Sequence, residues 1–306
     1  MIVTSKKVLE KANKGYYAVG AFNTSNLEMT KAIVDAATEL RSPVIVQTSS
    51  KAINYAGIKE LSNIIRVIGK NAKVPVILHL DHGPDINLVK QCLKNNWTSI
   101  MIDGSQYDFK KNVAITKKAV QLSHKKRVPV EAEIGKLQGV EGWVSVSEKD
   151  AIFTDPREAK LFVKQTRCDS LAIAIGTSHG AYKFKGSSNL DFGRLKEIKE
   201  EMDIPIVLHG ASSVPKDIVN MANKYGAKLK DAKGVSNAHL RKAVKLGINK
   251  INTDTDLRIA FDAAIRKELK ENPEVFDPRK ILAPAIDAIK KIVYQKIKLF
   301  GSEGKA

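Results

Sequence analysis

The chain has 306 residues and a formal net charge of +18, with 27% charged and 43% hydrophobic residues and two cysteines. No run of eighteen apolar residues occurs and charges are interleaved through the first residues, so we expect a soluble protein that is neither exported nor membrane-spanning. Cys92 and Cys168 lie in unrelated contexts, which argues against a disulfide framework or a cysteine-based zinc site and favours a reducing cytoplasm.

Short apolar, β-rich runs alternate with longer stretches of helical period along the whole chain. In chain order, the predicted strands span residues 17–22, 43–47, 75–80, 99–103, 128–134, 170–176, 205–210 and 248–252. Strict alternation of eight strands with helices predicts an α/β fold, a (β/α)8 TIM barrel. A doubly wound sheet would need a glycine-rich turn after its first strand, and the AFNTSNLE segment has no GxGxxG. We therefore predict a single TIM-barrel catalytic domain over residues 1–306.

Three connections exceed ordinary length, at 135–154, 177–190 and 224–235. Long connections in compact domains are usually functional or mobile. From about residue 277 to 300, an apolar 3–4 spacing predicts one or two additional C-terminal helices. Such a helix would either cover the barrel or form an oligomer contact.

The third predicted strand ends in HLDHG, residues 79–83, where an apolar run gives way to ionisable side chains. In a barrel, the carboxyl ends of all eight strands meet at one face, and function is built there. The polar residues expected at this face are Asn23, Gln47, Ser49, Asp81, His82, Asp103, Glu131, Glu133, Ser178, His179, His209, Asn252 and Asp254. These side chains are therefore expected to line a pocket.

Three histidines, His82, His179 and His209, follow strands three, six and seven, each beside a glycine. Three neutral imidazoles from separate strands form a catalytic zinc set that leaves an open position for water or substrate. One such histidine alone is more often a hydrogen-bonded structural residue, but the joint placement favours metal. His79 is expected to alternate away from the pocket, as a core residue or a support for a ligand.

Asp81 adjoins His82 and is expected on the other side of the chain, where a carboxylate near a divalent cation accepts a proton from a substrate hydroxyl. The alternative role for Asp81 is to orient a histidine. Asp103 and Glu133 are candidates for additional metal oxygens or for supporting contacts. Glu131 is expected on the same face as Glu133 but deeper in the barrel.

The 135–150 connection carries three glycines around Glu141. This pattern predicts a lid that brings a proton carrier over bound substrate, and a solvated loop with an incidental glutamate is the alternative.

Three segments are phosphate candidates: GTSHGAYK at 176–183, HGASS at 209–213 and NTDTDLR at 252–258. Backbone N–H groups after strands seven and eight of a barrel recurrently bind phosphate, helped by helix N-termini. Lys183 would add charge, and Arg258 would reach a second phosphate or pair with a surface acid.

Six motifs, HLDHG, MIDGS, VEAEIG, AIGTSHGAYK, LHGASS and INTDTDLR, occur in this order. In order and spacing they strongly resemble the class II, zinc-dependent fructose-1,6-bisphosphate aldolases. The likeness extends over essentially the whole chain, including the longer seventh unit and ELKENPEVFDPRK. It implies a lyase of glycolysis and gluconeogenesis that forms homodimers or homotetramers, and in some members a monovalent cation, Na or K, lies beside the phosphate.

Carried over by position, the resemblance assigns the zinc ligands to His82, His179 and His209. It gives Asp81 the proton exchange with the C4 oxygen, and Glu141 the proton transfer on the three-carbon ketose.

The resemblance also matches Asp103 and Glu133 to carboxylates that hold zinc in an alternative position. The matches for the ketose phosphate and neighbouring atoms are Gly180, Lys183, Gly210, Ser212, Asp254 and Thr255. Further substrate contacts are Asn23, Asn252, Ser49 and Arg258, the last two toward the other phosphate.

The implied reaction is a reversible aldol cleavage, in which zinc polarises the C2 carbonyl and stabilises the enediolate. Asp81 takes the C4 hydroxyl proton to give glyceraldehyde 3-phosphate, and Glu141 protonates the enediolate to give dihydroxyacetone phosphate. The lid departs from the family pattern Gly-Gly-x-Glu-Asp, because QGVEGW keeps Glu141 but loses the first glycine and the following aspartate.

Tagatose 1,6-bisphosphate, the C4 epimer, is the alternative substrate, although Asp254 stands where tagatose-type enzymes tend to carry a small apolar residue. A Schiff-base aldolase would need a strand-end lysine in an apolar pocket, and a zinc hydrolase would not require two phosphate cradles. A non-enzymatic alternative is a basic-surface protein that binds RNA or a surface receptor, and it predicts a steep salt dependence of binding and indifference to loss of His82. The dispersed, arginine-poor charge favours attraction of a small anionic substrate over nucleic acid.

Overall fold

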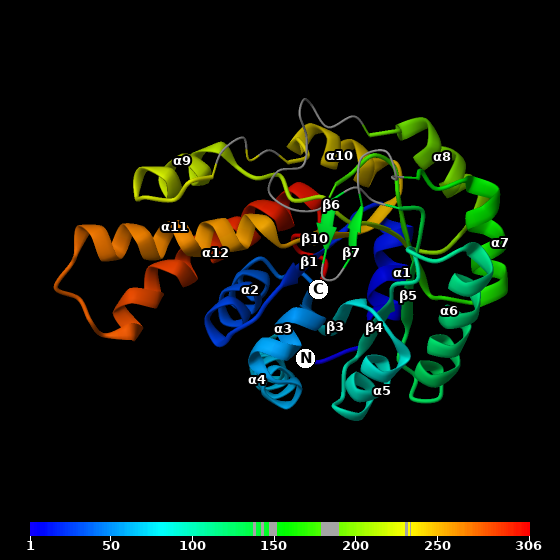
Figure 1. The fold of residues 1–306 in the computed structure, drawn as a ribbon, viewed down its shortest axis with the longest axis horizontal. Coiled ribbons are helices and arrows are strands. Elements are labelled where there is room, and N and C mark those ends of the chain that lie inside the picture. Colours follow the sequence, from blue (N-terminus) through cyan, green and yellow to red (C-terminus); the bar gives the residue numbers. More distant parts are fainter. Residues whose placement is uncertain (137–138, 142–143, 147–151, 179–189, 230–231, 233) are drawn as a thin grey trace.

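The computed structural model describes residues 1–136, 139–141, 144–146, 152–178, 190–229, 232 and 234–306. Within them, eight parallel strands close into a barrel surrounded by helices (Figure 1). The barrel strands are β1 (Val19–Asn23), β2 (Val44–Ser49), β3 (Val76–Gly83), β4 (Ser99–Ile102), β5 (Val130–Ile134), β8 (Ser170–Ile173), β9 (Ile206–Leu208) and β10 (Ile248–Thr253). The predicted (β/α)8 barrel is confirmed.

The strands follow one another around the barrel in chain order, and the ring closes where β1 pairs with β10. At this closure Val19 lies opposite Lys250, and Ala21 lies opposite Asn252. The strand residues are almost all buried, as expected for parallel strands that are covered on both faces. Parallel neighbours require crossover connections, which the helices supply.

Helices cover the outer face of the barrel (Figure 1). Their bounds are α1 (Ser5–Gly15), α2 (Leu27–Glu39), α3 (Ser50–Ala56), α4 (Ile58–Asn71), α5 (Ile86–Lys94), α6 (Phe109–His124), α7 (Pro156–Thr166), α8 (Phe192–Glu201), α9 (Lys216–Lys224), α10 (Asn237–Lys245), α11 (Thr255–Glu271) and α12 (Pro278–Phe300). Several begin with a side chain that accepts a hydrogen bond from the first turn, as Asn26 does for α2 and Asp85 for α5. None of the described helices is both long and apolar enough to cross a membrane.

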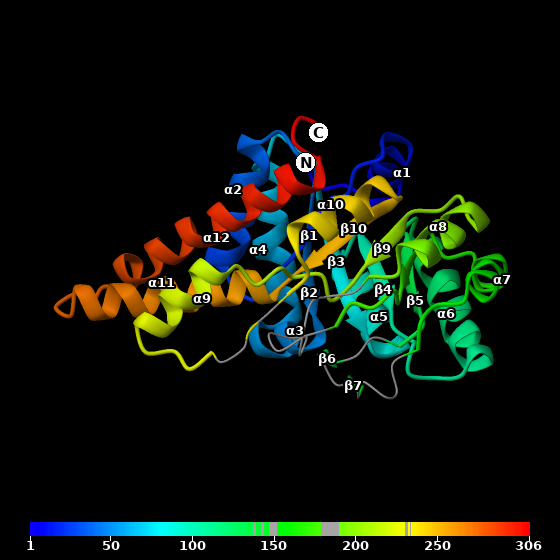
Figure 2. The same ribbon diagram turned by 90° about the horizontal axis from the view of Figure 1, so that it is seen from above.

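Helix α1 closes the amino-terminal end of the barrel (Figure 2). Its Leu9 packs in one apolar cluster with the inward residues Val19, Ala21, Ile45 and Ile77. These side chains are 5% exposed or less, so this end of the barrel is a packed core and is closed to solvent.

Helices α9, α11 and the start of α12 extend to one side of the barrel (Figures 1 and 2). Helix α12 begins at Pro278, and the preceding residue, Asp277, caps it by accepting a hydrogen bond from the backbone N–H of Arg279. It then returns to the barrel, where Val293, Ile297 and Phe300 are buried. The predicted additional C-terminal helix is therefore present, and it covers the barrel next to α2 and β1.

The predicted strand ranges run past the observed ends at several places, since β8 ends at Ile173 and β9 at Leu208. Strand pairing ends there because the chain turns away from the barrel wall. It then forms the loops at the carboxyl-terminal end of the barrel, which we call the mouth. The 135–154 connection contains an antiparallel pair that the sequence did not predict, β6 (Gly139–Glu141) with β7 (Val144–Val146). Figure 2 places this pair at the end of the barrel opposite to α1.

Candidate active site

The end of β3 departs from regular strand geometry. The register of β3 against β4 shifts between Leu80 and Gly83, and His82 has a left-handed φ of 45°. A side chain at Gly83 would place a Cβ 2.4 Å from the carbonyl oxygen of Met101, so only glycine fits there. Bulges of this kind redirect side chains next to active sites.

This bulge brings two adjacent side chains to the same space. Asp81 Oδ1 lies 4.0 Å from His82 Nε2, so the expectation that Asp81 points to the other side of the chain is wrong. Strict alternation applies only to a regular strand, and the left-handed residue breaks it.

His82 is oriented by a carboxylate on the neighbouring strand. Its Nδ1 lies 2.7 Å from Asp103 Oδ2, and the other oxygen of Asp103 accepts hydrogen bonds from the backbone N–H and the hydroxyl of Ser105. Burial alone would raise the pKa of Asp103, but the hydrogen bond and charge of His82 hold it below its usual range. Asp103 is therefore a fixed anion that turns His82 Nε2 toward Asp81.

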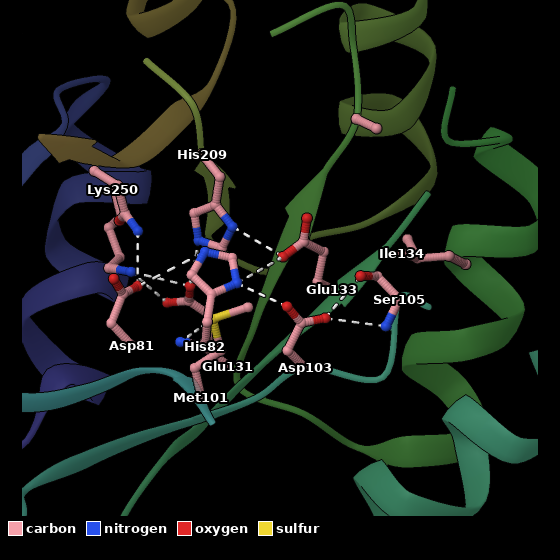
Figure 3. A network of polar contacts seen from close by, with 12 residues as sticks. Asp81, His82, Met101, Asp103, Ser105, Glu131, Glu133, Ile134, His209 and Lys250 are labelled. Carbon is pink, nitrogen blue, oxygen red and sulfur yellow. Dashed lines mark hydrogen bonds and ion pairs between the residues drawn. The ribbon is translucent and has the colours of Figure 1, made fainter. Parts of the chain in front are cut away.

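His209, one residue past β9, lies between two carboxylates of β5 (Figure 3). Its Nε2 lies 2.9 Å from Glu131 Oε1 and its Nδ1 lies 3.0 Å from Glu133 Oε2. Burial alone would lower the pKa of His209, but the charge of Glu133 and the hydrogen bonds to Glu131 and Glu133 raise it to about 9. Two acceptors on one ring stabilise the doubly protonated imidazole.

Two groups of donor atoms lie close enough to hold a divalent cation. In each group, one atom per residue lies within 4.8 Å of the others: Asp81, His82 and His209 in one, and His82, Asp103 and Glu133 in the other. The His82 and His209 ring centroids are 4.6 Å apart. Nitrogen and carboxylate donors at a buried mouth are the ligand types that zinc takes. These five residues therefore fit a divalent metal.

Asp81 is held by two amide groups. Asn23 Nδ2 donates to its Oδ2 and Asn252 Nδ2 donates to its Oδ1, both at 2.9 Å. Gln47 Nε2 in turn donates to Asn23 Oδ1 at 2.6 Å. Asp81 is 1% exposed, so these donors from β1 and β10 fix the plane of a buried carboxylate. Asp81 is therefore a hydrogen-bond acceptor with a fixed orientation, and transfer of a proton to a carboxylate requires such an orientation.

His79 lies inside the barrel directly below Asp81. It is 1% exposed, its Nδ1 lies 2.7 Å from Ser99 Oγ, and Lys250 Nζ lies 3.4 Å from its Nε2. The expectation that His79 alternates away from the pocket is wrong, because residues two apart on a strand share a face. Ile77, His79 and Asp81 therefore rise through the interior in that order, and His79 is a supporting residue.

The described parts of all three predicted phosphate segments lie together at the mouth. Gly210 has a φ of 60°, and a Cβ there would lie 2.7 Å from the carbonyl oxygen of Ser178, so the loops after β8 and β9 touch through backbone. The backbone N–H of Asp254 donates to Ser212 Oγ at 3.3 Å, which joins the loops after β9 and β10.

A buried ion pair supports the loop after β9. Asp256 accepts hydrogen bonds from the backbone N–H groups of Ser213 and Val214, at 3.1 and 2.7 Å, and Lys296 Nζ lies 2.7 Å from its Oδ2. Burial would raise the pKa of Asp256, but the Lys296 charge lowers it. Through Lys296, helix α12 therefore holds Asp256, and Asp256 in turn holds the backbone of this loop.

The remaining predicted contacts lie at the rim. Arg258 Nε donates to Asp254 Oδ1 at 2.8 Å, and the Arg258 side chain is 66% exposed, so it pairs with an acid at the surface. Thr255 is the first residue of α11. Ser49 ends β2, and its Oγ accepts the backbone N–H of Ala52 to cap α3.

Four predicted residues are not placed. His179, Gly180 and Lys183 lie outside the described residues. The backbone of Glu141 ends β6, but its side chain also lies outside what the structure describes.

The site prediction missed Lys250, Asp256 and Lys296, and it placed Gln47 at this face without giving it a role. Lys250 carries a signal in the sequence, because a lysine inside the predicted strand INKIN is charged where burial is expected. Lys296 gives no such signal, since it is one of many lysines on a long helix.

The family model for class II fructose-bisphosphate aldolases matches residues 3–305. The fructose-bisphosphate aldolase of Thermus caldophilus is 48% identical over 306 residues, and that of Helicobacter pylori strain J99 is 46% identical, each match covering all of both chains. Among solved structures, an aldolase of Escherichia coli K12 has a TM-score of 0.82 at 33% identity, with all of both chains covered. The fructose-bisphosphate aldolase of Campylobacter jejuni shares the fold, with a TM-score of 0.75 at 22% identity over 100% of this chain and 97% of that one.

Proposed function

The chain belongs to the class II fructose-bisphosphate aldolase family and is a lyase, and from this premise we propose that it cleaves fructose 1,6-bisphosphate reversibly. The products are dihydroxyacetone phosphate and glyceraldehyde 3-phosphate. The observation that carries the proposal is the convergence of Asp81, His82 and His209 at the barrel mouth.

The proposed zinc ligands are His82, His179 and His209, with Asp103 and Glu133 available for an alternative position of the ion. The 4.6 Å separation of the His82 and His209 rings supports a shared metal. When bound, zinc supplies positive charge that polarises the ketose C2 carbonyl and offsets the negative charge that develops during cleavage.

Asp81 accepts the proton of the C4 hydroxyl as the C3–C4 bond breaks. Its buried carboxylate is held in one plane by the Asn23 and Asn252 amides, so its free lone pairs point in fixed directions. In the reverse reaction the same group returns the proton to the C4 oxygen.

Glu141 is proposed to deliver the second proton, to C3 of the three-carbon ketose. The glycines around it and the position of β6 at the mouth are consistent with a lid. The lid sequence QGVEGW keeps this glutamate while it departs from the usual family pattern on both sides of it.

The ketose phosphate is proposed to bind at the loops after the last three strands. The residues assigned there are Gly180, Lys183, Gly210, Ser212, Asp254 and Thr255, with a monovalent cation, Na or K, beside them. Asn23 and Asn252 contact the substrate between the phosphates, and Ser49 and Arg258 face the second phosphate. The overall charge of +18 favours approach of a substrate with two phosphates.

We further propose that the whole chain acts as one catalytic domain of a cytoplasmic homodimer or homotetramer in glycolysis and gluconeogenesis.

Burial raises the pKa of the Cys168 thiol to about 12, so this thiol stays protonated and unreactive. Nucleic acid is not an expected partner.

The test is triose phosphate release from fructose 1,6-bisphosphate and from tagatose 1,6-bisphosphate, before chelation, after it, and with zinc restored. We expect fructose-selective cleavage that vanishes on chelation and returns with zinc. Activity that survives thorough chelation would exclude the zinc mechanism. Preference for tagatose bisphosphate would move the substrate assignment to the C4 epimer, and failure to cleave either ketose despite bound zinc would reject both substrates.

A further inference from the structure

A buried polar network lies inside the barrel beneath the candidate metal position (Figure 3). Lys250 Nζ lies 2.9 Å from both oxygens of Glu131 and 3.4 Å from His79 Nε2. On its other side, His79 Nδ1 lies 2.7 Å from Ser99 Oγ. This hydroxyl lies 2.9 Å from Ser5 Oγ on α1. Lys250, Glu131 and His79 are each 2% exposed or less.

The protonation states in this network are determined by its geometry. Burial, and then the Lys250 charge, lower the pKa of His79 to about 3, so His79 is neutral and its Nε2 accepts from Lys250. The Lys250 ammonium lies 2.9 Å from each oxygen of Glu131, and His209 Nε2 lies 2.9 Å from its Oε1. Glu131 is therefore a buried carboxylate that faces donors from two residues and is paired with Lys250.

This anion faces one nitrogen of a proposed metal ligand. Glu131 Oε1 accepts from His209 Nε2 at 2.9 Å, which keeps a proton on that nitrogen. A histidine that ligates a metal commonly donates its other ring N–H to a carboxylate, which fixes the tautomer and the ring plane. The opposite nitrogen, Nδ1, lies 3.0 Å from Glu133 Oε2, and Glu133 belongs to one of the two groups of donor atoms that fit a metal.

We propose that Glu131 and Lys250 are positioning residues for the metal site, which hold the proton on His209 Nε2 and thereby present Nδ1 to the ion. Glu131 acts through His209, and Lys250 acts through Glu131 by keeping it charged and in place. The inference rests on the proposed function, because it needs a metal at His209.

A purely structural role would not require these groups. The next inward layer toward α1 is filled by Val19, Ala21, Ile45 and Ile77, so apolar side chains are able to fill this barrel. Replacing a buried ion pair by apolar residues is often neutral or stabilising, so such a pair needs another reason to be present.

The experiment measures zinc affinity, by competition with a chromophoric chelator, for the full-length wild type, Glu131→Gln, Lys250→Met and the double variant. The visible absorption spectrum of the Co²⁺ form reports the ligand geometry independently of activity. Ile45→Ala is the control for loss of stability, because Ile45 is fully buried in the apolar cluster toward α1 and makes none of its described contacts with His209.

We expect Glu131→Gln to weaken zinc binding by about 10- to 100-fold and to alter the Co²⁺ spectrum. Lys250→Met should weaken zinc binding by about tenfold, and the double variant should bind no more weakly than Glu131→Gln alone, because one residue acts through the other. Ile45→Ala should retain wild-type zinc affinity.

Unchanged zinc affinity in folded Glu131→Gln would overturn the inference, as would an equal loss in Ile45→Ala or strictly additive losses in the double variant. If Lys250→Met does not fold, the zinc affinity and the Co²⁺ spectrum of Glu131→Gln are sufficient to test the inference. A wild type that binds neither Zn²⁺ nor Co²⁺ would overturn the proposed metal-dependent function itself, which distinguishes the two failures.

Discussion

The barrel interior has two layers that are built by the same strands and do different work. Toward α1 the inward side chains are apolar, as at Ile45 and Ile77, and they pack to 0% exposure. Two residues further along β3 the inward side chain is His79, and two further it is Asp81. The inward row of one strand therefore passes from a packed core through a polar support to the proposed proton acceptor, so the side chains that stabilise the fold and those proposed for catalysis lie at different depths along the barrel axis.

Replacing Asp81 by Asn tests the layer at the mouth, and we expect it to have the largest effect of the changes considered. The amide keeps the shape but loses the proton acceptor, so we expect kcat to fall by about 10³-fold, or about 4 kcal/mol in activation free energy. Steady-state cleavage of fructose 1,6-bisphosphate measures this loss.

Zinc content and thermal unfolding of the same Asp81→Asn protein are the controls. Both should stay close to wild type, because the proposed zinc ligands are histidines and because a turn of the Asn252 amide lets its oxygen accept a hydrogen bond from the introduced NH2 group. A folded, zinc-loaded variant with more than a tenth of wild-type kcat would show that another group carries the proton.

Replacing Ile77 by Ala tests the apolar end. A fully buried Ile→Ala change removes contacts and leaves a cavity, so the free energy of unfolding should fall by about 3 kcal/mol. Chemical denaturation measures the loss, and zinc affinity under native conditions should be unchanged. Equal loss of stability and of zinc affinity would mean that the two layers are not separable.

The division of the interior into an apolar layer and a polar layer also explains which features can be predicted from the sequence alone. Eight buried strands follow from apolar runs, and the functional face follows from the histidines and carboxylates at their ends. The orientation of Asp81 was not predictable, because a bulge and a left-handed His82 override the alternation of a strand. The partners of Lys250 and Lys296 depend on contacts between residues more than 39 positions apart, which no local pattern encodes.

The pH response of His209 tests whether its environment differs from that of an ordinary histidine. In the metal-free protein its pKa is raised from 6.5 to about 9, because the effects of Glu133 and Glu131 exceed that of burial. A raised folded-state pKa stabilises the protein fully below pH 6.5, and this contribution, about 3 kcal/mol, is lost as the pH rises through 9.

Side-chain NMR of the metal-free protein should follow the His209 ring with a midpoint near pH 9. Unfolding free energies between pH 6.5 and 9.5 should fall in parallel, and saturating zinc should remove the His209 titration because the ion replaces the Nδ1 proton. A midpoint near 6.5 would mean that the two carboxylates do not hold the ring as described.

The smallest expected effect lies at the rim, where Arg258 pairs with Asp254 at the surface. Arg258→Ala should change the free energy of unfolding by about 0.5 kcal/mol or less, because exposed i,i+4 pairs contribute little. If Arg258 binds the second phosphate, KM for fructose 1,6-bisphosphate should rise about tenfold with kcat retained, as loss of uniform binding requires. Arg266→Ala is the matched control, since Arg266 forms an i,i+4 pair with Asp262 on the same helix, with Nε 2.7 Å from Oδ2. Equal KM values in the two variants would remove Arg258 from the substrate site and leave its ion pair as a surface contact, which would restrict the reactive layer to the buried groups around His82 and His209.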